Sequence, residues 1–192
     1  MKTLADAWGW YESTRRSLEQ MQRIGRRYWP LIPWNDEPLI GRDDAFRTLD
    51  SRDIEIATAA SLAPIDDLAI VVLFSVFESL VRDHLVELIQ PEATSLIDPI
   101  LKDAAEDAIR GVQEGSFYNK VLEPLKSQAR VSSDLVTQVN QVRDYRNWVA
   151  HGRRDAPDNF VSPLASYERL KRFLDALGIA ADSEKSSTEV HE

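Results

Sequence analysis

The sequence of 192 residues contains no cysteine. Disulfide bonds, thiolate metal sites and a cysteine nucleophile are therefore excluded. Glycine is also scarce, with seven residues in the whole chain, and the strict alternation of apolar and polar residues that is typical of strands is missing. These absences favour a protein built almost entirely from helices. With 43% hydrophobic and 29% charged residues, the chain has the composition of a globular protein that buries a sizeable core.

Long hydrophobic runs are absent as well. The first residues lack the apolar stretch of a signal peptide. The most apolar segment, 68–77, is far shorter than the roughly 20 residues that span a bilayer, and acidic residues flank it on both sides. We therefore expect a cytoplasmic protein that does not associate with membranes.

Positive charge is in short supply, since the formal net charge is −9. That balance argues against a protein that coats nucleic acid through bulk electrostatics. Two stretches reverse the sign locally. Residues 15–27 carry five arginines against Glu19, a formal charge of +4, and residues 141–154 carry four arginines against Asp144, a formal charge of +3. An acidic protein with a local basic site is therefore expected.

Helical periodicity and capping residues predict an all-α fold, an up-and-down bundle of four to five core helices with an additional long N-terminal helix. Pro64 is expected to open the central helix and Pro91 to end it, while Asp98 and either Ser132 or Ser133 are expected N-caps. The predicted helices span about residues 4–28, 64–90, 99–110, 117–128, 133–151 and 163–177. The expected organisation is an N-terminal helix (1–30), a proline-containing connection with a short helix near 52–62 (31–63), the bundle (64–178) and a disordered polar tail (179–192).

The segment DYRNWVAHGRR carries the most informative pattern. Arg146 is followed directly by Asn147 and, after three more residues, by His151 near the end of a predicted helix. Upstream, FSVFESLVRDHL places an aromatic-rich face before Glu78 and Arg82. An Arg-Asn-x3-His-Gly motif together with this second helix resembles the HEPN family of helical-bundle ribonucleases and toxins. The resemblance covers roughly residues 64–178.

This resemblance implies four or five helices, often a homodimer and, in many members, metal-independent cleavage of RNA. Arg146, Asn147 and His151 of two protomers would then meet in one catalytic cleft, without a cofactor. It also implies a role as a toxin or anti-phage defence component, with an antitoxin or other defence-system protein as a partner. Some members carry a tyrosine two residues after the histidine, which a partner nucleotidyltransferase modifies. Arg153 occupies that position here, so the resemblance does not carry over that mode of neutralisation.

The residue types suit this chemistry. A histidine can move protons near neutral pH when a 2′-hydroxyl attacks the adjacent phosphate. An arginine can hold the phosphate and stabilise the extra negative charge of the transition state, and Asn147 can orient either partner. The first product would be a 2′,3′-cyclic phosphate. RNA-binding or supporting roles are predicted for Arg143, Asp144, Arg153, Arg154, Glu78 and Arg82.

Helix geometry leaves alternatives open. Arg146 and His151 lie about 140° apart around the helix, so Arg143 is a rival for the phosphate contact unless pairing occurs across a dimer. In a purely structural interpretation, His151 binds the last carbonyls of its helix and Arg146 pairs with Glu78 or Asp83.

Two further assignments stay open in the second helix of the resemblance. Glu78 and Arg82 are spaced to form an ion pair. His84 is either a core or surface residue or part of the cleft. Two other functions therefore stand beside the nuclease: a non-catalytic HEPN module that binds RNA, nucleotide or a partner protein, and a structural dimerisation domain.

Overall fold

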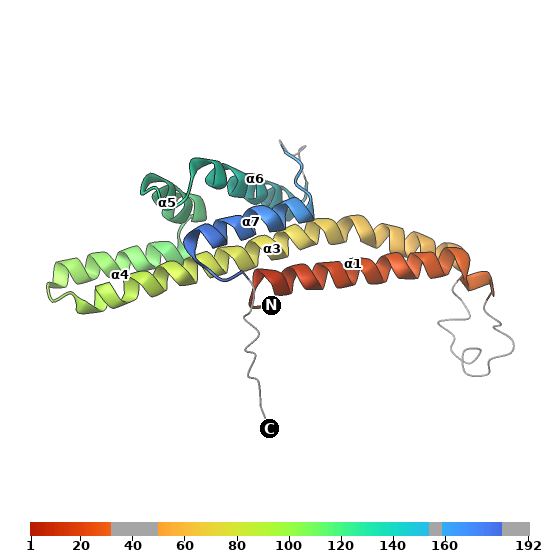
Figure 1. Cartoon of the computed structure of the whole chain (residues 1–192), viewed down its shortest axis with the longest axis horizontal. Helices are drawn as coiled ribbons and strands as arrows, with labels where there is room; N and C mark the ends of the chain where they lie inside the picture. Colours follow the sequence, from red (N-terminus) through yellow and green to blue (C-terminus); the bar gives the residue numbers. More distant parts are fainter. Residues whose placement is uncertain (32–49, 154–158, 182–192) are drawn as a thin grey trace, which may run out of the picture. The chain divides into compact units, whose positions relative to one another are not determined.

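A computed structural model of the chain describes residues 1–31, 50–153 and 159–181 (Figure 1). These residues form helices and no strand, which confirms the predicted all-α helical bundle with a long N-terminal helix. The helices are α1 (Leu4–Arg27), the 3-10 turn η1 (Trp29–Leu31), α3 (Ser51–Ser95), α4 (Pro99–Glu114), the π-helix η3 (Tyr118–Leu122), α5 (Glu123–Ser127), α6 (Ser133–Ala150) and α7 (Pro163–Leu177). Part of the predicted connection, 32–49, and most of the predicted tail, 182–192, lie outside the described residues.

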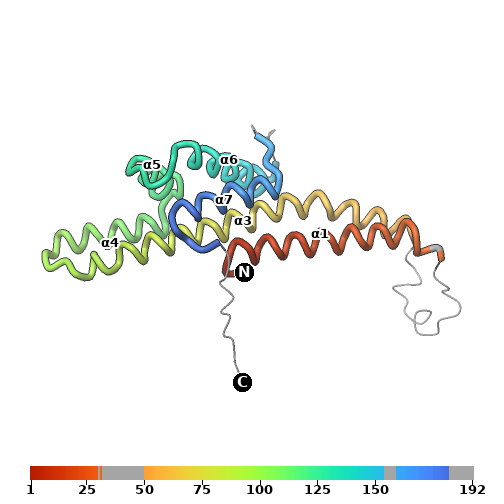
Figure 2. Tube along the Cα trace, viewed as in Figure 1, coloured from red at the N-terminus to blue at the C-terminus, as the bar shows by residue number. Residues whose placement is uncertain are grey.

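Contacts divide the chain into two compact units, each of which takes residues from both α1 and α3. We call Met1–Trp8 with Ala69–Glu192 the bundle unit, and Gly9–Leu68 the hairpin unit. The tube in Figure 2 shows both long helices as uninterrupted coils. The predicted boundary at residue 64 therefore falls inside a continuous helix.

Two predicted helix ends are wrong, because α3 runs from Ser51 to Ser95 through both Pro64 and Pro91. A proline inside a helix removes one hydrogen bond and crowds the carbonyl four residues earlier, at a cost of about 3 kcal/mol. Both prolines lie on exposed positions, as do Ala60 and Glu87, whose carbonyls lose their helical donors. Water can bind those carbonyls, and burial of the apolar residues between the prolines offsets the remaining cost.

The bundle unit is organised around a cluster of buried phenylalanines. Phe77 of α3 lies with its ring centroid 5.4 Å from that of Phe173 of α7 and 5.9 Å from that of Phe117. Phe74 completes the cluster at 5.8 Å from both Phe77 and Phe117. Such tilted and edge-on pairs add to the stabilisation from burial itself. This cluster fixes the part of α3 that also carries the predicted residues Glu78 and Arg82.

Capping residues set most of the shorter helices as predicted. Asp98 caps α4 through the N–H groups of Ile100 and Leu101, and Ser132 caps α6 through that of Leu135. Gly178 ends α7 in a left-handed conformation with φ of 71°. Helix α4, however, continues past its predicted end at Arg110 as far as Glu114.

The predicted helix 117–128 is divided in two, a π-helix followed by α5. Pro124 has no N–H to donate to the carbonyl of Lys120, so the regular series of α-helical hydrogen bonds is interrupted there. The N–H of Glu123 instead binds the carbonyl of Tyr118, five residues earlier. Single π turns of this kind occur often at functional sites, and this one presents Tyr118 and Val121 to different pockets.

The hairpin unit is held by polar contacts between α1 and the first part of α3. The hydroxyl of Tyr11 donates to Asp66 at 2.8 Å, and Arg15 pairs with the same carboxylate. Burial and this hydrogen bond raise the pKa of Tyr11. Near the other end of the unit, the hydroxyl of Ser51 donates to the carbonyl of Gly25 at 2.6 Å.

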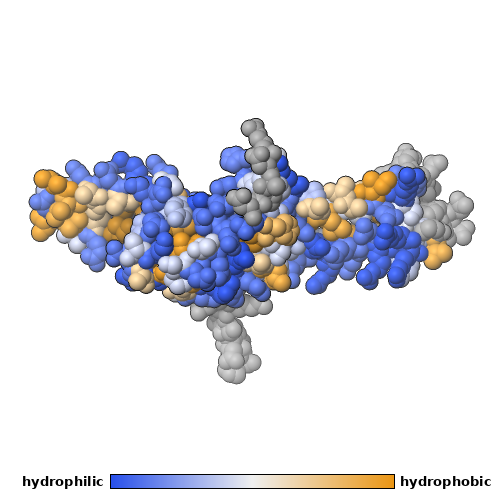
Figure 3. Space-filling view, turned by 90° about the horizontal axis from the view of Figure 1, so that it is seen from above, coloured by the Kyte–Doolittle hydropathy of each residue, from blue (hydrophilic) through white to orange (hydrophobic). Residues whose placement is uncertain are grey.

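Apolar surface also gathers outside the core. In the bundle unit, Ile97, Ile100 and Leu101 are exposed where α3 gives way to α4, and Figure 3 shows this apolar surface. Within the described residues, α3 is the one helix long and apolar enough by composition to cross a membrane, with mean hydropathy 1.9 over its best 18 residues. The core helix of a soluble protein passes the same test.

Candidate functional site

Helix α6 positions the central residues of the predicted site. Its buried face consists of Val136, Val139, Val142 and Tyr145. Arg143, Arg146 and Asn147 follow at the edge of this face, spaced i, i+3 and i+4, so they share one side of the helix. The sequence pattern thus places two arginines and an amide where α6 faces the end of α4 and η3.

These residues line a pocket in the bundle unit with a volume of about 400 Å³, which we call the arginine pocket. Residues of α3, of α6 and of the segment from the end of α4 into η3 line it. The residues that line the arginine pocket are Phe74, Glu78, Arg82, Gly115, Ser116, Phe117, Tyr118, Arg143, Arg146 and Asn147.

Glu78 links the two helices of the motif. One carboxylate oxygen accepts from Arg82 Nε at 3.0 Å and Nη2 at 2.6 Å, and the other lies 3.5 Å from Arg146 Nη2. The predicted Glu78–Arg82 ion pair is therefore confirmed. Of the two partners suggested for Arg146, Glu78 is the one that the structure brings to it. Arg146 also donates through Nη1 to Asn147 Oδ1 at 2.9 Å.

Arg82 has a second set of partners at the end of α4. It donates through Nη1 to the carbonyl of Val112 and through Nη2 to that of Gly115 at 3.0 Å. Carbonyls in the last turn of a helix have no partner within the helix, and a cation there also suits the negative end of the helix dipole. With a side chain only 15% exposed, Arg82 joins α3 to α4 and is one of the residues that line the pocket.

Each of the three arginines lies over an aromatic ring. The guanidinium carbon of Arg82 is 5.3 Å from the ring centre of Phe117, that of Arg143 is 5.0 Å from Tyr118, and that of Arg146 is 5.2 Å from Phe74. Cation–π contacts at this distance stabilise a guanidinium by about 0.5–2 kcal/mol. They fix the planar face against the protein, so the edges with the N–H donors are held in defined orientations.

The pocket is strongly cationic for an acidic protein. Three arginines line it against the single carboxylate of Glu78, a formal charge of +2. Arg143 Nη2 also lies 3.0 Å from Oδ1 of Asp144, whose side chain is 57% exposed. Arg143 Nε is buried and no described residue accepts its proton. Fixed guanidinium edges around an open polar space are suited to a phosphate or carboxylate.

The other predicted residues lie outside this lining. His151 is exposed at the C-cap of α6, one turn beyond Asn147. There its backbone N–H binds the carbonyl of Asn147 at 2.9 Å, and Gly152 ends the helix with φ of 79°. Arg153 follows, with its guanidinium carbon 5.7 Å from the ring centre of Trp148. Arg154 lies outside the described residues. Within one chain, Arg146 and His151 do not converge on the arginine pocket.

Sequence reasoning missed the aromatic half of the site. Phe74 belongs to the aromatic-rich segment that carries the family resemblance, so its nearness to Glu78 was foreseeable. Phe117 and Tyr118 lie after the end of α4, and nothing in their local sequence links them to arginines on α3 and α6. His84 lines a different pocket. Among the described residues, no cluster of three or more His, Asp or Glu side chains is arranged to hold a metal ion.

Comparisons of this chain with protein-family models, with curated proteins and with solved structures find no significant match.

Proposed function

We propose that the chain is an RNA-binding ribonuclease of the HEPN type, in which the arginine pocket holds a phosphate of the RNA. The observation that carries this proposal is the convergence of Arg82, Arg143 and Arg146 on one polar pocket, each backed by an aromatic ring. The predicted motif contributes Arg146 and Asn147 to that pocket, and His151 follows on the same helix.

The proposed reaction needs no oxidant and no second substrate. The 2′-oxygen of a ribose attacks the adjacent phosphorus, the bond from phosphorus to the 5′-oxygen breaks, and a 2′,3′-cyclic phosphate and a 5′-hydroxyl result. His151 moves the proton, while Arg143 and Arg146 stabilise charge on the non-bridging oxygens. Because His151 lies outside the pocket lining of its own chain, we propose that a second copy supplies it in a homodimer.

The cellular setting follows from the same proposal. We place the protein in the cytoplasm, with the apolar part of α3 as the core helix of a soluble bundle. A toxin or anti-phage defence role, with an antitoxin or other defence-system protein as partner, rests on the HEPN resemblance alone.

A non-catalytic module that binds RNA or nucleotide is the second candidate, and the position of His151 favours it. The arginine pocket by itself offers donors for an anion, but no histidine is among its described lining residues. Glu78 also neutralises part of the charge of Arg146, which suits a site that binds an anion with moderate affinity.

Incubation of the protein with structured RNA in EDTA tests the proposal. We expect wild type to produce cyclic-phosphate ends, and His151→Ala to lose activity by about 10²–10⁴-fold, the usual contribution of a proton-transfer group. Arg146→Met should weaken both cleavage and RNA binding. His84→Ala and Arg172→Met serve as matched controls outside the site.

The outcomes separate the two candidates. RNA binding without cleavage by folded wild type would support the binding module. Cleavage that survives both His151→Ala and Arg146→Met would contradict the assigned site. Absence of both binding and cleavage would overturn the RNA function altogether.

A further inference from the structure

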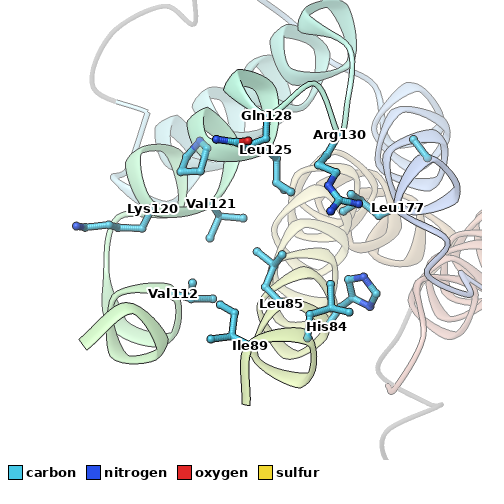
Figure 4. Close-up of a pocket in the computed structure, with 13 residues that line it drawn as sticks. His84, Leu85, Ile89, Val112, Lys120, Val121, Leu125, Gln128, Arg130 and Leu177 are labelled. Carbon is cyan, nitrogen blue, oxygen red and sulfur yellow. The ribbon is translucent and has the colours of Figure 1, made fainter. Parts of the chain in front are cut away.

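A second pocket in the bundle unit differs from the arginine pocket in its lining and chemistry. It has a volume of about 460 Å³ and lies among α3, the end of α4, η3, α5 and the end of α7 (Figure 4). We call it the apolar pocket. Figure 4 shows Leu85 and Ile89 of α3 across from Val121 and Leu125, with Val112 beside them. A cavity of this size holds a small organic molecule.

The lining selects for an aliphatic ligand. Hydrophobic side chains form most of it, and the imidazole of His84 is the one aromatic ring among the described residues that line it. No Phe, Tyr or Trp therefore offers a nucleobase the stacking surface that is usual in single-strand sites. A hydrocarbon chain gains about 25 cal/mol for each Å² of apolar surface removed from water, and it needs no directional partner along its length.

The charges at the pocket select for an anion. Its charged lining residues, Lys120 and Arg130, are both basic, and no acidic residue is among the described lining residues. Figure 4 shows Arg130 and His84 on the same side of the pocket, next to Leu177, while Lys120 extends away from the apolar side chains. Neither Lys120 nor Arg130 forms an ion pair with a described residue. In a chain of net charge −9, this local positive charge is complementary to a carboxylate.

The backbone at the pocket is fixed by the turn that ends α5. Ala129, between the lining residues Gln128 and Arg130, adopts a left-handed conformation with φ of 54°. This conformation costs an alanine about 1 kcal/mol, and it is the usual left-handed stop at the C-terminal end of a helix. The turn is fixed because the N–H of Arg130 binds the carbonyl of Leu125 at 3.0 Å.

We propose that the apolar pocket binds an aliphatic carboxylate of the fatty-acid type. The hydrocarbon lies against Leu85, Ile89, Val121 and Leu125, and the carboxylate meets the guanidinium of Arg130 at the mouth, beside His84. This binding is independent of RNA, so it stands or fails separately from the nuclease proposal.

Isothermal titration of the full chain with decanoate, below its micelle concentration, tests the proposal. We expect one saturable site per chain. Arg130→Gln should weaken binding roughly tenfold, since a charge-assisted contact to a carboxylate is lost. Lys102→Gln, an equal change of charge on α4 outside the pocket, should leave it unchanged. Decyltrimethylammonium, with the same chain and the opposite charge, should bind at least tenfold more weakly than decanoate.

A steric variant tests the position of the site. Ala176 lines the pocket and is exposed, so Ala176→Trp should block decanoate without disturbing the core, whereas Ala108→Trp on exposed α4 surface should not. Circular dichroism checks that each variant is folded. Absence of saturable binding, equal affinity for the cationic analogue, or unchanged binding by Ala176→Trp would overturn the proposal. Equal binding by wild type and Arg130→Gln would overturn the assigned contact between the carboxylate and Arg130.

Discussion

Arg82 and Arg143 both line the arginine pocket, yet their guanidinium groups have different partners. Arg82 donates to Glu78 and to two backbone carbonyls at the end of α4. Arg143 has the exposed Asp144 and the ring of Tyr118. The first set is mostly buried and structural, while the second leaves the guanidinium available at the pocket edge. Substitution of Arg82 is therefore expected to affect mainly stability, and substitution of Arg143 mainly binding.

We expect Arg82→Met to lower the free energy of unfolding by about 3 kcal/mol, because two carbonyls lose their donor and Glu78 keeps only Arg146. Arg143→Met should lower it by no more than about 1 kcal/mol while weakening RNA binding. Urea denaturation followed by circular dichroism measures the first quantity and filter binding the second. Equal losses of stability would show that Arg143 is as structural as Arg82.

Ala129 offers a test of backbone strain. It occupies the left-handed position after α5, where its N–H binds the carbonyl of Lys126 and the next N–H binds that of Leu125. Glycine adopts this conformation without a steric penalty. Ala129→Gly should therefore raise the free energy of unfolding by about 0.5–1 kcal/mol. Ala108→Gly, in the middle of α4, should lower it by about 1 kcal/mol, and a loss for both variants would contradict the assigned strain.

The sequence predicted part of the site for physical reasons that can be named. Arg146 falls on the apolar stripe of its predicted helix, so its charge requires a partner. Glu78 was one of the two carboxylates that were predicted as that partner. The spacing of Glu78 and Arg82 alone fixed their ion pair. The cation–π contacts were beyond prediction because they depend on how far α4 continues, which decides where Phe117 and Tyr118 lie.

Helix boundaries likewise could be predicted only where local interactions decide them. Asp98, Ser132 and Gly178 act through local hydrogen bonds and backbone conformation, so their positions predicted helix ends correctly. Pro64 and Pro91 carry an equally local signal, and it was overridden by burial along α3. Local rules succeed where the competing energies are local. They fail where a long helix gains more from packing than one missing hydrogen bond costs.

The pairing of α1 with the start of α3 depends on a close approach at Gly25. A Cβ at this position would lie 2.7 Å from Ile54 Cγ2 and 3.1 Å from Ile54 Cβ. Those atoms belong to a stiff, β-branched side chain. We expect Gly25→Ala to lower the free energy of unfolding by about 1–2 kcal/mol, because overpacking outweighs the gain in helix propensity.

A double-mutant cycle checks this cause. In an Ile54→Ala background the 2.7 Å contact with Cγ2 is absent and only the 3.1 Å approach to Cβ remains, so Gly25→Ala should lose most of its cost. Ile54→Val keeps Cγ2 and should preserve the destabilisation, which makes it the matched control. A cost for Gly25→Ala that is the same in all three backgrounds would show that packing on Ile54 is not its source.

The whole molecule is acidic, so binding of a polyanion has to come from a few local groups. The arginine pocket contributes a formal charge of +2 from its lining. The other basic stretch, 15–27, is partly neutralised within the hairpin unit. There, Arg15 pairs with Asp66 and Glu19, and Arg26 donates to Glu55 at 2.7 Å.

The salt dependence of RNA affinity tests whether the pocket is the binding site. Each phosphate contact on a single strand contributes about −0.7 to the slope of log K against log salt concentration, so two to three contacts predict a slope between about −1.4 and −2.1. Arg143→Met should reduce its magnitude by about 0.7, whereas Arg16→Gln combined with Arg23→Gln should leave it unchanged. A slope steeper than about −4 that falls in the second variant would place the RNA on α1 instead. That result would remove the arginine pocket from the proposed function, because a site held by bulk charge along one helix has no need of three guanidinium groups fixed on aromatic rings.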